Sequence, residues 1–181
     1  MKTLRRSLYY ATLCLALVLT ACSSDDDNET NNNEGNNGGS GELFIAKIDG
    51  NDFAASQDPA TLIGATKSTA NGMTLITGQG STNTGEFINF GIFDYNGPGT
   101  YITGNNLTNP NYLRYGELVG QTAMVWGSDL ATFAAGIGPG ELVVTVDADG
   151  KLEGTFTFEG YNAQDMTTKM VTQGQFNVTI D

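Results

Sequence analysis

The chain has 181 residues, contains no histidine, and carries both of its cysteines, Cys14 and Cys22, close to the N-terminus. Residues 42–181 number 140 and contain 15 acidic and 5 basic side chains, a formal charge of −10. In that region these counts exclude Ser-His-Asp and Cys-His catalysis, zinc sites built from His or Cys, and histidine-ligated haem. The negative charge repels phosphate backbones, so we expect no nucleic-acid partner.

The first 21 residues have the pattern of a signal peptide. Lys2, Arg5 and Arg6 form a positive start without any acid, and residues 8–19 follow as an apolar run. This run is shorter than the roughly 20 residues that a transmembrane helix needs. The segment is therefore predicted to be a secretory signal rather than a membrane span.

The sequence Leu19-Thr20-Ala21-Cys22 resembles the lipobox of bacterial lipoproteins. The resemblance implies cleavage before Cys22 and acylation of Cys22 by chains such as palmitate, which would tether the protein to a membrane. Two or three acyl chains anchor stably, whereas a single chain binds only marginally. The alternative is an ordinary secretory signal cleaved after Ala21, which would leave a free thiol.

Residues 22–41 form an acidic linker rich in Asn and Gly. The cluster Asp25-Asp26-Asp27 directly behind Cys22 resembles the signal that exports Bacteroidetes lipoproteins to the outer face of the outer membrane. The alternative is a linker that is merely well solvated. Residues 23–41 hold no aromatic or aliphatic side chain, so they are predicted to be disordered and to span roughly 25 Å.

Residues 42–181 are predicted to be one all-β domain, because apolar residues alternate in short segments between Gly, Asn and Asp clusters. We expect an antiparallel β-sandwich of about 8–10 strands, with a partly closed barrel as the alternative. The predicted strands are 43–48, 61–66, 73–78, 87–95, 100–103, 112–118, 122–126, 141–147, 151–159 and 172–181.

The clearest pair of strands is the predicted hairpin of 141–147 and 151–159. Gly150 supplies the positive φ that a tight turn requires. Alternation predicts the same inward face for six apolar side chains: Leu142, Val144, Val146, Leu152, Phe156 and Phe158. Residues 160–169 then form a predicted polar loop.

One short helix is predicted over Ser128–Ala135, although an extra strand fits this segment equally well. Ser128 or Asp129 would be its N-cap and Gly136 its C-terminal stop.

Four segments in this order resemble an uncharacterised family of Bacteroidetes lipoproteins that carry a single β-rich domain behind a lipobox. They are Ala46-Lys47-Ile48-Asp49-Gly50 with Phe53-Ala54-Ala55, Gly97-Pro98-Gly99-Thr100-Tyr101, Leu152-Glu153-Gly154-Thr155-Phe156-Thr157-Phe158, and Val171-Thr172-Gln173-Gly174-Gln175-Phe176-Asn177-Val178. The resemblance covers nearly all of residues 42–181. It implies the fold and the membrane address, and it carries no assigned activity or catalytic residues.

Acidic side chains around the hairpin turn are weak candidates for a metal site. Asp147, Asp149 and Glu153 could offer oxygen ligands to calcium, but Gly150 and Lys151 break the spacing of an EF-hand loop. A plain hairpin turn explains these residues, so neither a metal nor a cofactor is predicted.

Four tyrosines in or beside loops rich in Asn and Gly are weak candidates for ligand binding: Tyr101, Tyr112, Tyr115 and Tyr161. Flat rings beside amides can stack on sugar C–H faces and bond sugar hydroxyls. Aromatic rings also fill β-sheet cores, and core packing is the alternative for each of them.

These observations together predict a lipoprotein of the outer membrane that faces the cell exterior and acts as a non-catalytic binding or surface-structural module. Its ligand would be a glycan or a surface protein. The alternatives are a glycoside-active enzyme that works through two carboxylates, and an assembly or spacer protein of the cell envelope.

Replacing Asp25, Asp26 and Asp27 by asparagine tests the export signal. We expect the wild-type protein to be cleaved when intact cells are treated with protease, and the variant to be protected. Immunoblots of treated and lysed cells measure this difference. Equal cleavage of both proteins would leave the cluster without an export role.

Overall fold

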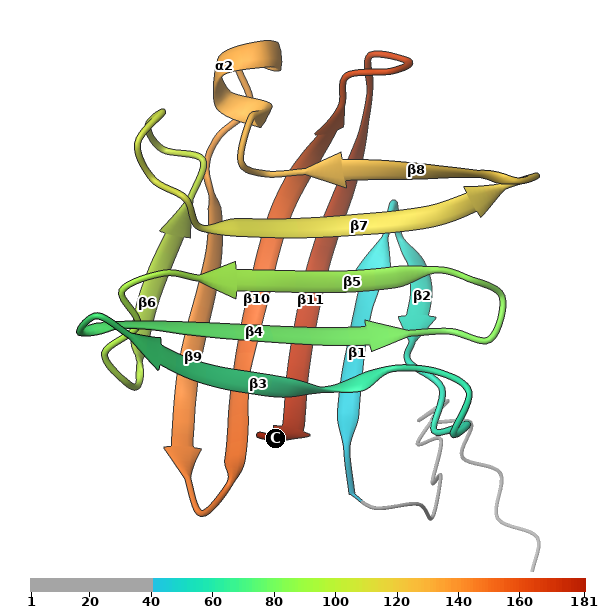
Figure 1. The fold of residues 1–181 in the computed structure, drawn as a ribbon. Helices are drawn as coiled ribbons and strands as arrows, with labels where there is room; N and C mark the ends of the chain where they lie inside the picture. The colour runs from blue at the N-terminus through green and yellow to red at the C-terminus, as the bar shows by residue number, and fades with distance from the viewer. Residues whose placement is uncertain (1–40) are drawn as a thin grey trace, which may run out of the picture. The chain divides into compact units, whose positions relative to one another are not determined.

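The computed structural model describes residues 41–181, so the predicted signal peptide, Cys22 and the Asp25–Asp27 cluster lie outside the described part. Within it the chain forms one short helix and the following strands (Figure 1): β1 (Leu43–Ile48), β2 (Asn51–Ala54), β3 (Ile63–Ala70), β4 (Met73–Ser81), β5 (Phe87–Ile92), β6 (Gly99–Thr103), β7 (Tyr112–Val119), β8 (Thr122–Gly127), β9 (Gly140–Ala148), β10 (Lys151–Asn162) and β11 (Thr167–Thr179). The helix is α2 (Ala131–Ala135). No helix of the described residues is long and apolar enough to cross a bilayer.

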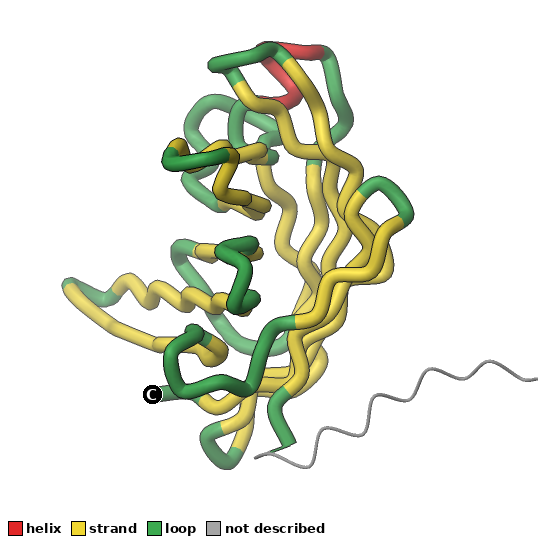
Figure 2. The backbone as a smooth tube through the Cα atoms, turned by 90° about the vertical axis from the view of Figure 1, so that its right-hand side faces the viewer, coloured by secondary structure: helices red, strands yellow, loops and turns green. Residues whose placement is uncertain are grey.

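The strands form one antiparallel sheet that does not close, and the sheet folds over itself into two layers. Strands β8-β7-β5-β4-β3 make the front layer of Figure 1, and β2-β1-β11-β10-β9-β6 make the back layer behind it. The strands of the two layers cross steeply, and the view from the side shows the layers facing each other (Figure 2). The prediction of an all-β antiparallel sandwich is confirmed. The strands number 11 because β2 adds one that the pattern did not predict.

The two layers join where the end of β10 meets β8. Tyr161 of β10 is the residue that pairs with β8, opposite Gly127. The backbones approach so closely here that a Cβ at Gly160 would lie 2.7 Å from the carbonyl carbon of Trp126. At the opposite edge of the front layer, Ala65 of β3 forms a single parallel bridge with Ile180.

Three hairpins turn on two residues that both have positive φ. They connect β1 to β2, β3 to β4, and β9 to β10, and their turn residues are Asp49-Gly50, Asn71-Gly72 and Asp149-Gly150. This geometry belongs to the type I′ turn, whose twist matches that of the flanking strands. The Asp-Gly turn predicted for the β9–β10 hairpin is therefore present.

A bulge in β9 overturns one part of the prediction for that hairpin. The register shifts between Glu153 and Gly154, which face Val146 and Val144. A bulge changes the face to which the following side chains point. Val146 therefore shares the outer face with Glu153 and is only half-buried, whereas Asp147 pairs with buried Leu152 on the inner face.

Two further predictions need correction. The helix spans only Ala131–Ala135, because Ser128 and Asp129 use their side chains elsewhere and Leu130 occupies the N-cap without a side-chain bond. Gly136 ends the helix in the left-handed conformation, as predicted. The predicted loop 160–169 is a hairpin instead, since β10 continues to Asn162 and β11 starts at Thr167.

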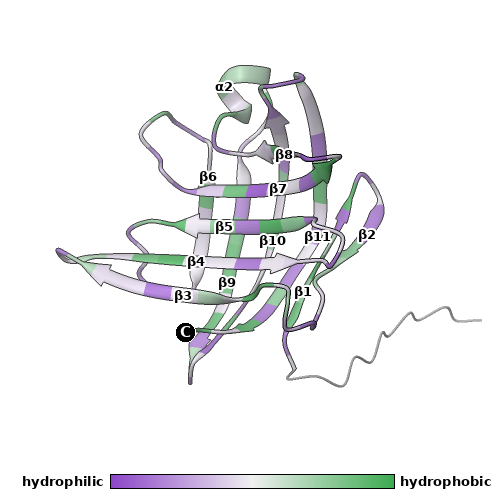
Figure 3. Cartoon of the chain, turned by 45° about the vertical axis from the view of Figure 1, so that its right-hand side comes forward, coloured by the Kyte–Doolittle hydropathy of each residue, from purple (hydrophilic) through white to green (hydrophobic). Residues whose placement is uncertain are grey.

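Four phenylalanine rings fill the centre of the core. Phe44, Phe90, Phe156 and Phe176 lie with ring centroids 5.1–6.4 Å apart. Each ring occupies the space above a glycine, where a Cβ would clash with it; the pairs are Phe90–Gly78, Phe44–Gly80, Phe176–Gly154 and Phe156–Gly174. Hydrophilic and hydrophobic residues alternate along the strands around this centre (Figure 3). Three of these glycines pair with their phenylalanine on the neighbouring strand of the same layer, and Gly80 faces Phe44 from the opposite layer. The rings therefore fit because side chains are absent at these positions.

Substituting Gly78 by alanine should destabilise the fold, because the new Cβ would lie 2.5 Å from Cε1 of Phe90 in a packed core. Overpacking of this kind costs about 1–3 kcal/mol of unfolding free energy. Gly99→Ala is the matched control, since nothing lies within 4 Å of its Cβ position. Urea denaturation measures both variants, and equal stabilities would contradict this account of the core.

Candidate ligand-binding face

A concavity of about 380 Å³ opens on the outer face of the front layer. Its lining mixes amides, hydroxyls, one carboxylate, one phenol ring, apolar side chains and backbone of strands β3, β4, β5 and β7. The lining residues are Leu62, Ile63, Gly64, Ala65, Thr66, Thr77, Gly78, Gln79, Asn89, Phe90, Tyr112 and Asp181. A site of this volume lies within the range that small ligands occupy.

Strand register places the polar side chains of this face in one row across the front layer. Gln79 of β4 faces Asn89 of β5, and Asn89 faces Arg114 of β7. On the two outer strands the positions of this row are glycines, Gly64 of β3 and Gly127 of β8. Because neighbours in such a row point to the same side of a sheet, two amides and a guanidinium stand side by side.

Asn89 is the residue of this face that has a buried polar atom without a hydrogen-bond partner. Its Oδ1 is buried, and no described residue donates a hydrogen bond to it. A buried acceptor without a donor costs about 1–3 kcal/mol, so folding alone gives no reason for it. The χ2 torsion of asparagine is soft, so rotation of the amide can change the exposure of this oxygen.

Tyr112 forms one wall of the concavity. Its ring lies over Gly91, where a Cβ would come within 2.6 Å of Cζ, and the guanidinium of Arg114 lies 4.3 Å from the ring centroid. Arg114 Nη2 also donates to Asp129 Oδ2 at 3.0 Å, which neutralises its charge. No described residue forms a hydrogen bond with the Tyr112 hydroxyl, so this group is free to bond a ligand.

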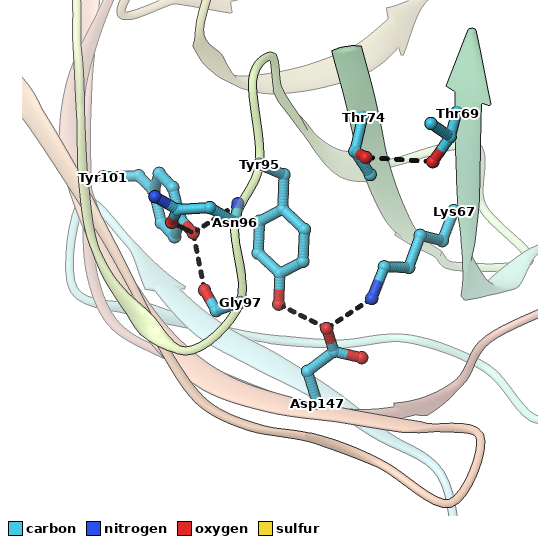
Figure 4. Close-up of polar contacts among 8 residues, drawn as sticks. All are labelled: Lys67, Thr69, Thr74, Tyr95, Asn96, Gly97, Tyr101 and Asp147. Atoms are coloured by element: carbon cyan, nitrogen blue, oxygen red, sulfur yellow. Dashed lines mark hydrogen bonds and ion pairs between the residues drawn. The ribbon is translucent and has the colours of Figure 1, made fainter. Parts of the chain in front are cut away.

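Two other predicted site residues, Tyr101 and Asp147, lie in a separate cluster at an edge of the sandwich (Figure 4). The Tyr101 hydroxyl donates to Asn96 Oδ1 at 3.1 Å and to the Gly97 carbonyl, and it accepts from the Asn96 N–H at 3.3 Å. Its ring packs against Tyr95 with centroids 5.4 Å apart. The Tyr101 hydroxyl is thus used by the loop that precedes β6.

Asp147 joins the two layers in the same cluster. Its Oδ2 accepts from Lys67 Nζ of the front layer at 2.6 Å and from the Tyr95 hydroxyl at 3.0 Å. Lys67 also lies over the Tyr95 ring, 5.2 Å from the centroid. We name Lys67, Tyr95 and Asp147 the edge latch, because they connect β3 to β9 across the open side of the sandwich.

The electrostatics of the edge latch favour a structural role. Burial acts to raise the pKa of Asp147, but the hydrogen bonds from Lys67 and Tyr95 and the charge of Lys67 outweigh it and lower that pKa. Burial and the neighbouring Asp147 carboxylate raise the pKa of Tyr95. Both pKa values move away from neutrality, whereas a general acid or base needs a pKa near the working pH.

The remaining predicted tyrosines do not line the concavity. Tyr115 is buried in the core against Trp126, with centroids 5.8 Å apart, and its hydroxyl contacts Glu86 Oε1 at 2.9 Å and Glu117 Oε2 at 2.8 Å. Burial and these carboxylates raise the pKa of Tyr115. Tyr161 is half-buried at the junction of β10 with β8. Of the four candidate tyrosines, Tyr112 alone stands at the concavity.

The acidic candidates are likewise dispersed. Asp147 is used by the edge latch, Asp149 forms the exposed turn, and Glu153 faces outward. Within residues 41–181, no three His, Cys, Asp or Glu side chains gather in a group that could hold a metal ion.

A second concavity of about 360 Å³ lies on the outer face of the back layer. Its lining includes Glu141, Thr155, Thr157, Gln173 and Gln175. Neither concavity is lined by two carboxylates, the arrangement that a glycosidase requires.

Sequence reasoning missed Asn89 and Gln79. A signal for Asn89 was present, because it is the one polar side chain in the strand Phe87-Ile88-Asn89-Phe90-Gly91-Ile92. Its alignment with Gln79 and Arg114 depends on strand pairing, which the pattern of a single strand does not contain.

Comparison with known proteins returned no match: no protein-family model, no curated protein and no solved structure is significantly similar to this chain.

Substituting Asp147 by asparagine tests the edge latch. The pKa of this carboxyl in the folded protein lies below its ordinary value of 3.8, so its contribution to stability is complete above pH 3.8 and is lost as the pH falls through the folded value. We expect Asp147→Asn to lower the unfolding free energy by about 1–3 kcal/mol at neutral pH, and this deficit to shrink in acid.

Asp149→Asn is the matched control, because Asp149 is an exposed turn residue and asparagine also tolerates positive φ. Its unfolding free energy should stay within about 0.5 kcal/mol of wild type. Urea titrations across the acidic range measure both variants. A deficit of Asp147→Asn that does not change with pH would contradict the electrostatic role of the latch.

Proposed function

We propose that this protein is a surface lipoprotein of the outer membrane whose β-sandwich binds glycans without catalysing a reaction. The observation that carries the proposal is the unpartnered amide oxygen of Asn89 in a concavity that Gln79 and Tyr112 also line. Tyr101, Tyr115 and Asp147 use their side-chain oxygens within the domain, whereas this face keeps polar groups available for a ligand.

The chemistry of the concavity suits a sugar. Amide groups both donate and accept hydrogen bonds, as sugar hydroxyls do, and the hydroxyls of Thr66, Thr77 and Tyr112 extend the same capacity. Apolar ring and backbone surface lies beside them, as in ligand sites that combine an apolar lining with a few polar groups. A glycan offers hydroxyls and C–H faces together, so it matches both parts of the lining.

The proposed address rests on the N-terminal sequence. Acylation of Cys22 would hold the protein on the outer membrane, and Asp25-Asp26-Asp27 would direct it to the exterior. There the domain would meet polysaccharides outside the cell. Its formal charge of −10 favours neutral ligands over anionic ones.

Substituting Asn89 by alanine tests the proposal. Glycan affinity should fall at least about tenfold, equivalent to about 1.4 kcal/mol, because the central hydrogen-bonding group is lost. The unfolding free energy should stay equal or rise, since the removed amide leaves a buried oxygen without a partner in the folded state.

The mature lipoprotein in detergent, applied to a glycan array and then titrated with the glycans it binds, gives the affinity, and urea denaturation gives the stability. Gln175→Ala is the matched control, since Gln175 is an exposed amide on the outer face of the back layer. A blank array, or equal glycan binding by Asn89→Ala and wild type, would refute the proposal.

A further inference from the structure

A second aromatic ring lies on the outer face of the front layer, next to the concavity but not part of its lining. Phe87 of β5 faces Gly116 of β7, and its ring covers the place where a Cβ at Gly116 would stand. Phe87 is half-buried, so part of the ring remains in contact with solvent. The Phe87 ring thus packs against the backbone of Gly116, which has no side chain, and lies on the surface of the sheet.

The register of β5 sets the distance from this ring to the polar row. Phe87 and Asn89 are two residues apart, so they point to the same face and are separated by about 6.6 Å. This spacing is close to the length of one sugar unit in an extended chain. Tyr112 lies beyond Asn89, since it pairs with Gly91 of the same strand. Ring, amide and phenol therefore follow one another along β5.

The charges beside Phe87, Asn89 and Tyr112 restrict the kind of ligand that can bind along β5. Arg114, the cross-strand neighbour of Asn89, is paired with Asp129 through Nη2 at 3.0 Å and Nε at 3.5 Å. Its positive charge is thereby compensated before any ligand arrives. No other Lys or Arg belongs to the row of Gln79, Asn89 and Arg114 or to the lining of the concavity, and the one charged residue of that lining is Asp181.

We propose that Phe87 forms a second subsite, so that the face binds an extended, uncharged oligosaccharide along β5. One sugar unit occupies the concavity at Asn89 and Tyr112, and a neighbouring unit stacks its C–H face on the Phe87 ring. This inference rests on the proposed glycan binding and adds the direction, minimum length and charge of the ligand.

Exposed Leu118 and Val125 are further apolar residues at the β7–β8 end of the front layer, and they raise the question of a protein ligand. The row of amides beside Phe87 favours the sugar, because protein-binding surfaces place apolar residues at the centre. If Phe87 served a protein ligand instead, oligosaccharide binding would not depend on Phe87. The experiment below therefore decides between a sugar and a protein at this residue.

The test is calorimetry of the mature lipoprotein in detergent with glucose, mannose and their neutral oligosaccharides up to the hexasaccharide. Wild type should bind longer chains more tightly than short ones. Phe87→Leu keeps an apolar side chain on Gly116 but removes the flat ring, so it should abolish the gain with length and leave monosaccharide affinity unchanged. Phe87→Tyr should retain the gain. Matching urea denaturation of the variants establishes that they fold.

Two further measurements sharpen the test. Affinity should stay constant as salt concentration rises, because the ligand carries no charge, and oligosaccharides of uronic acids should bind more weakly than neutral ones. Gln175→Ala should behave as wild type at every chain length.

The outcomes separate the two proposals. If wild type binds oligosaccharides but Phe87→Leu matches it at every length, the second subsite is refuted and the binding face survives. If wild type binds none of the neutral oligosaccharides, both proposals fall. Tighter binding of the uronic acid series overturns the assignment of an uncharged ligand.

Discussion

The close fit of phenylalanine rings onto glycines is the constraint on which the rest of this structure depends. Two β-layers that cross steeply must still fill the space between them at the density of a protein interior. Phe44, Phe90, Phe156 and Phe176 provide the volume, and glycines provide the room: Gly80 faces Phe44 from the opposite layer, and the other three glycines lie on the neighbouring strand of the same layer. The same device recurs on the outer face, where Phe87 and Tyr112 lie on Gly116 and Gly91. The high glycine content, 24 residues in the chain, thus serves packing as well as turns.

The part of the fold that follows from local pattern was predictable from the sequence. Alternating residues such as Leu152, Phe156 and Phe158 identify strands because a strand repeats every two residues. The Asp149-Gly150 turn identifies a hairpin because few residue pairs tolerate its dihedral angles. Features that depend on partners distant in sequence were not predictable. The bulge that turns Asp147 inward reflects the pairing of β9 with β10, and Asp147 finds Lys67 only after folding.

The same difference between local pattern and long-range pairing explains which residues of the candidate site could be predicted from the sequence. Tyrosines beside Asn and Gly predict aromatic rings near loops. The sequence pattern does not show whether a tyrosine hydroxyl is hydrogen-bonded within the domain or free. Tyr101 and Tyr115 have their hydroxyls bonded within the domain, whereas the hydroxyl of Tyr112 has no partner among the described residues. Asn89 was missed because its significance comes from a hydrogen bond that is absent. Only the three-dimensional neighbourhood reveals such an absence.

Unpaired polar atoms are informative here because they are few. Within residues 41–181, three buried side-chain atoms have no hydrogen-bond partner: Asn89 Oδ1, Thr132 Oγ1 and Asn162 Nδ2. Thr132 belongs to α2, and Asn162 ends β10 and accepts the Gln164 N–H at 2.7 Å through its other amide atom. Asn89 is the one of the three that lines a concavity. The proposed binding face rests on this combination of an unpaired buried acceptor and a concavity beside it.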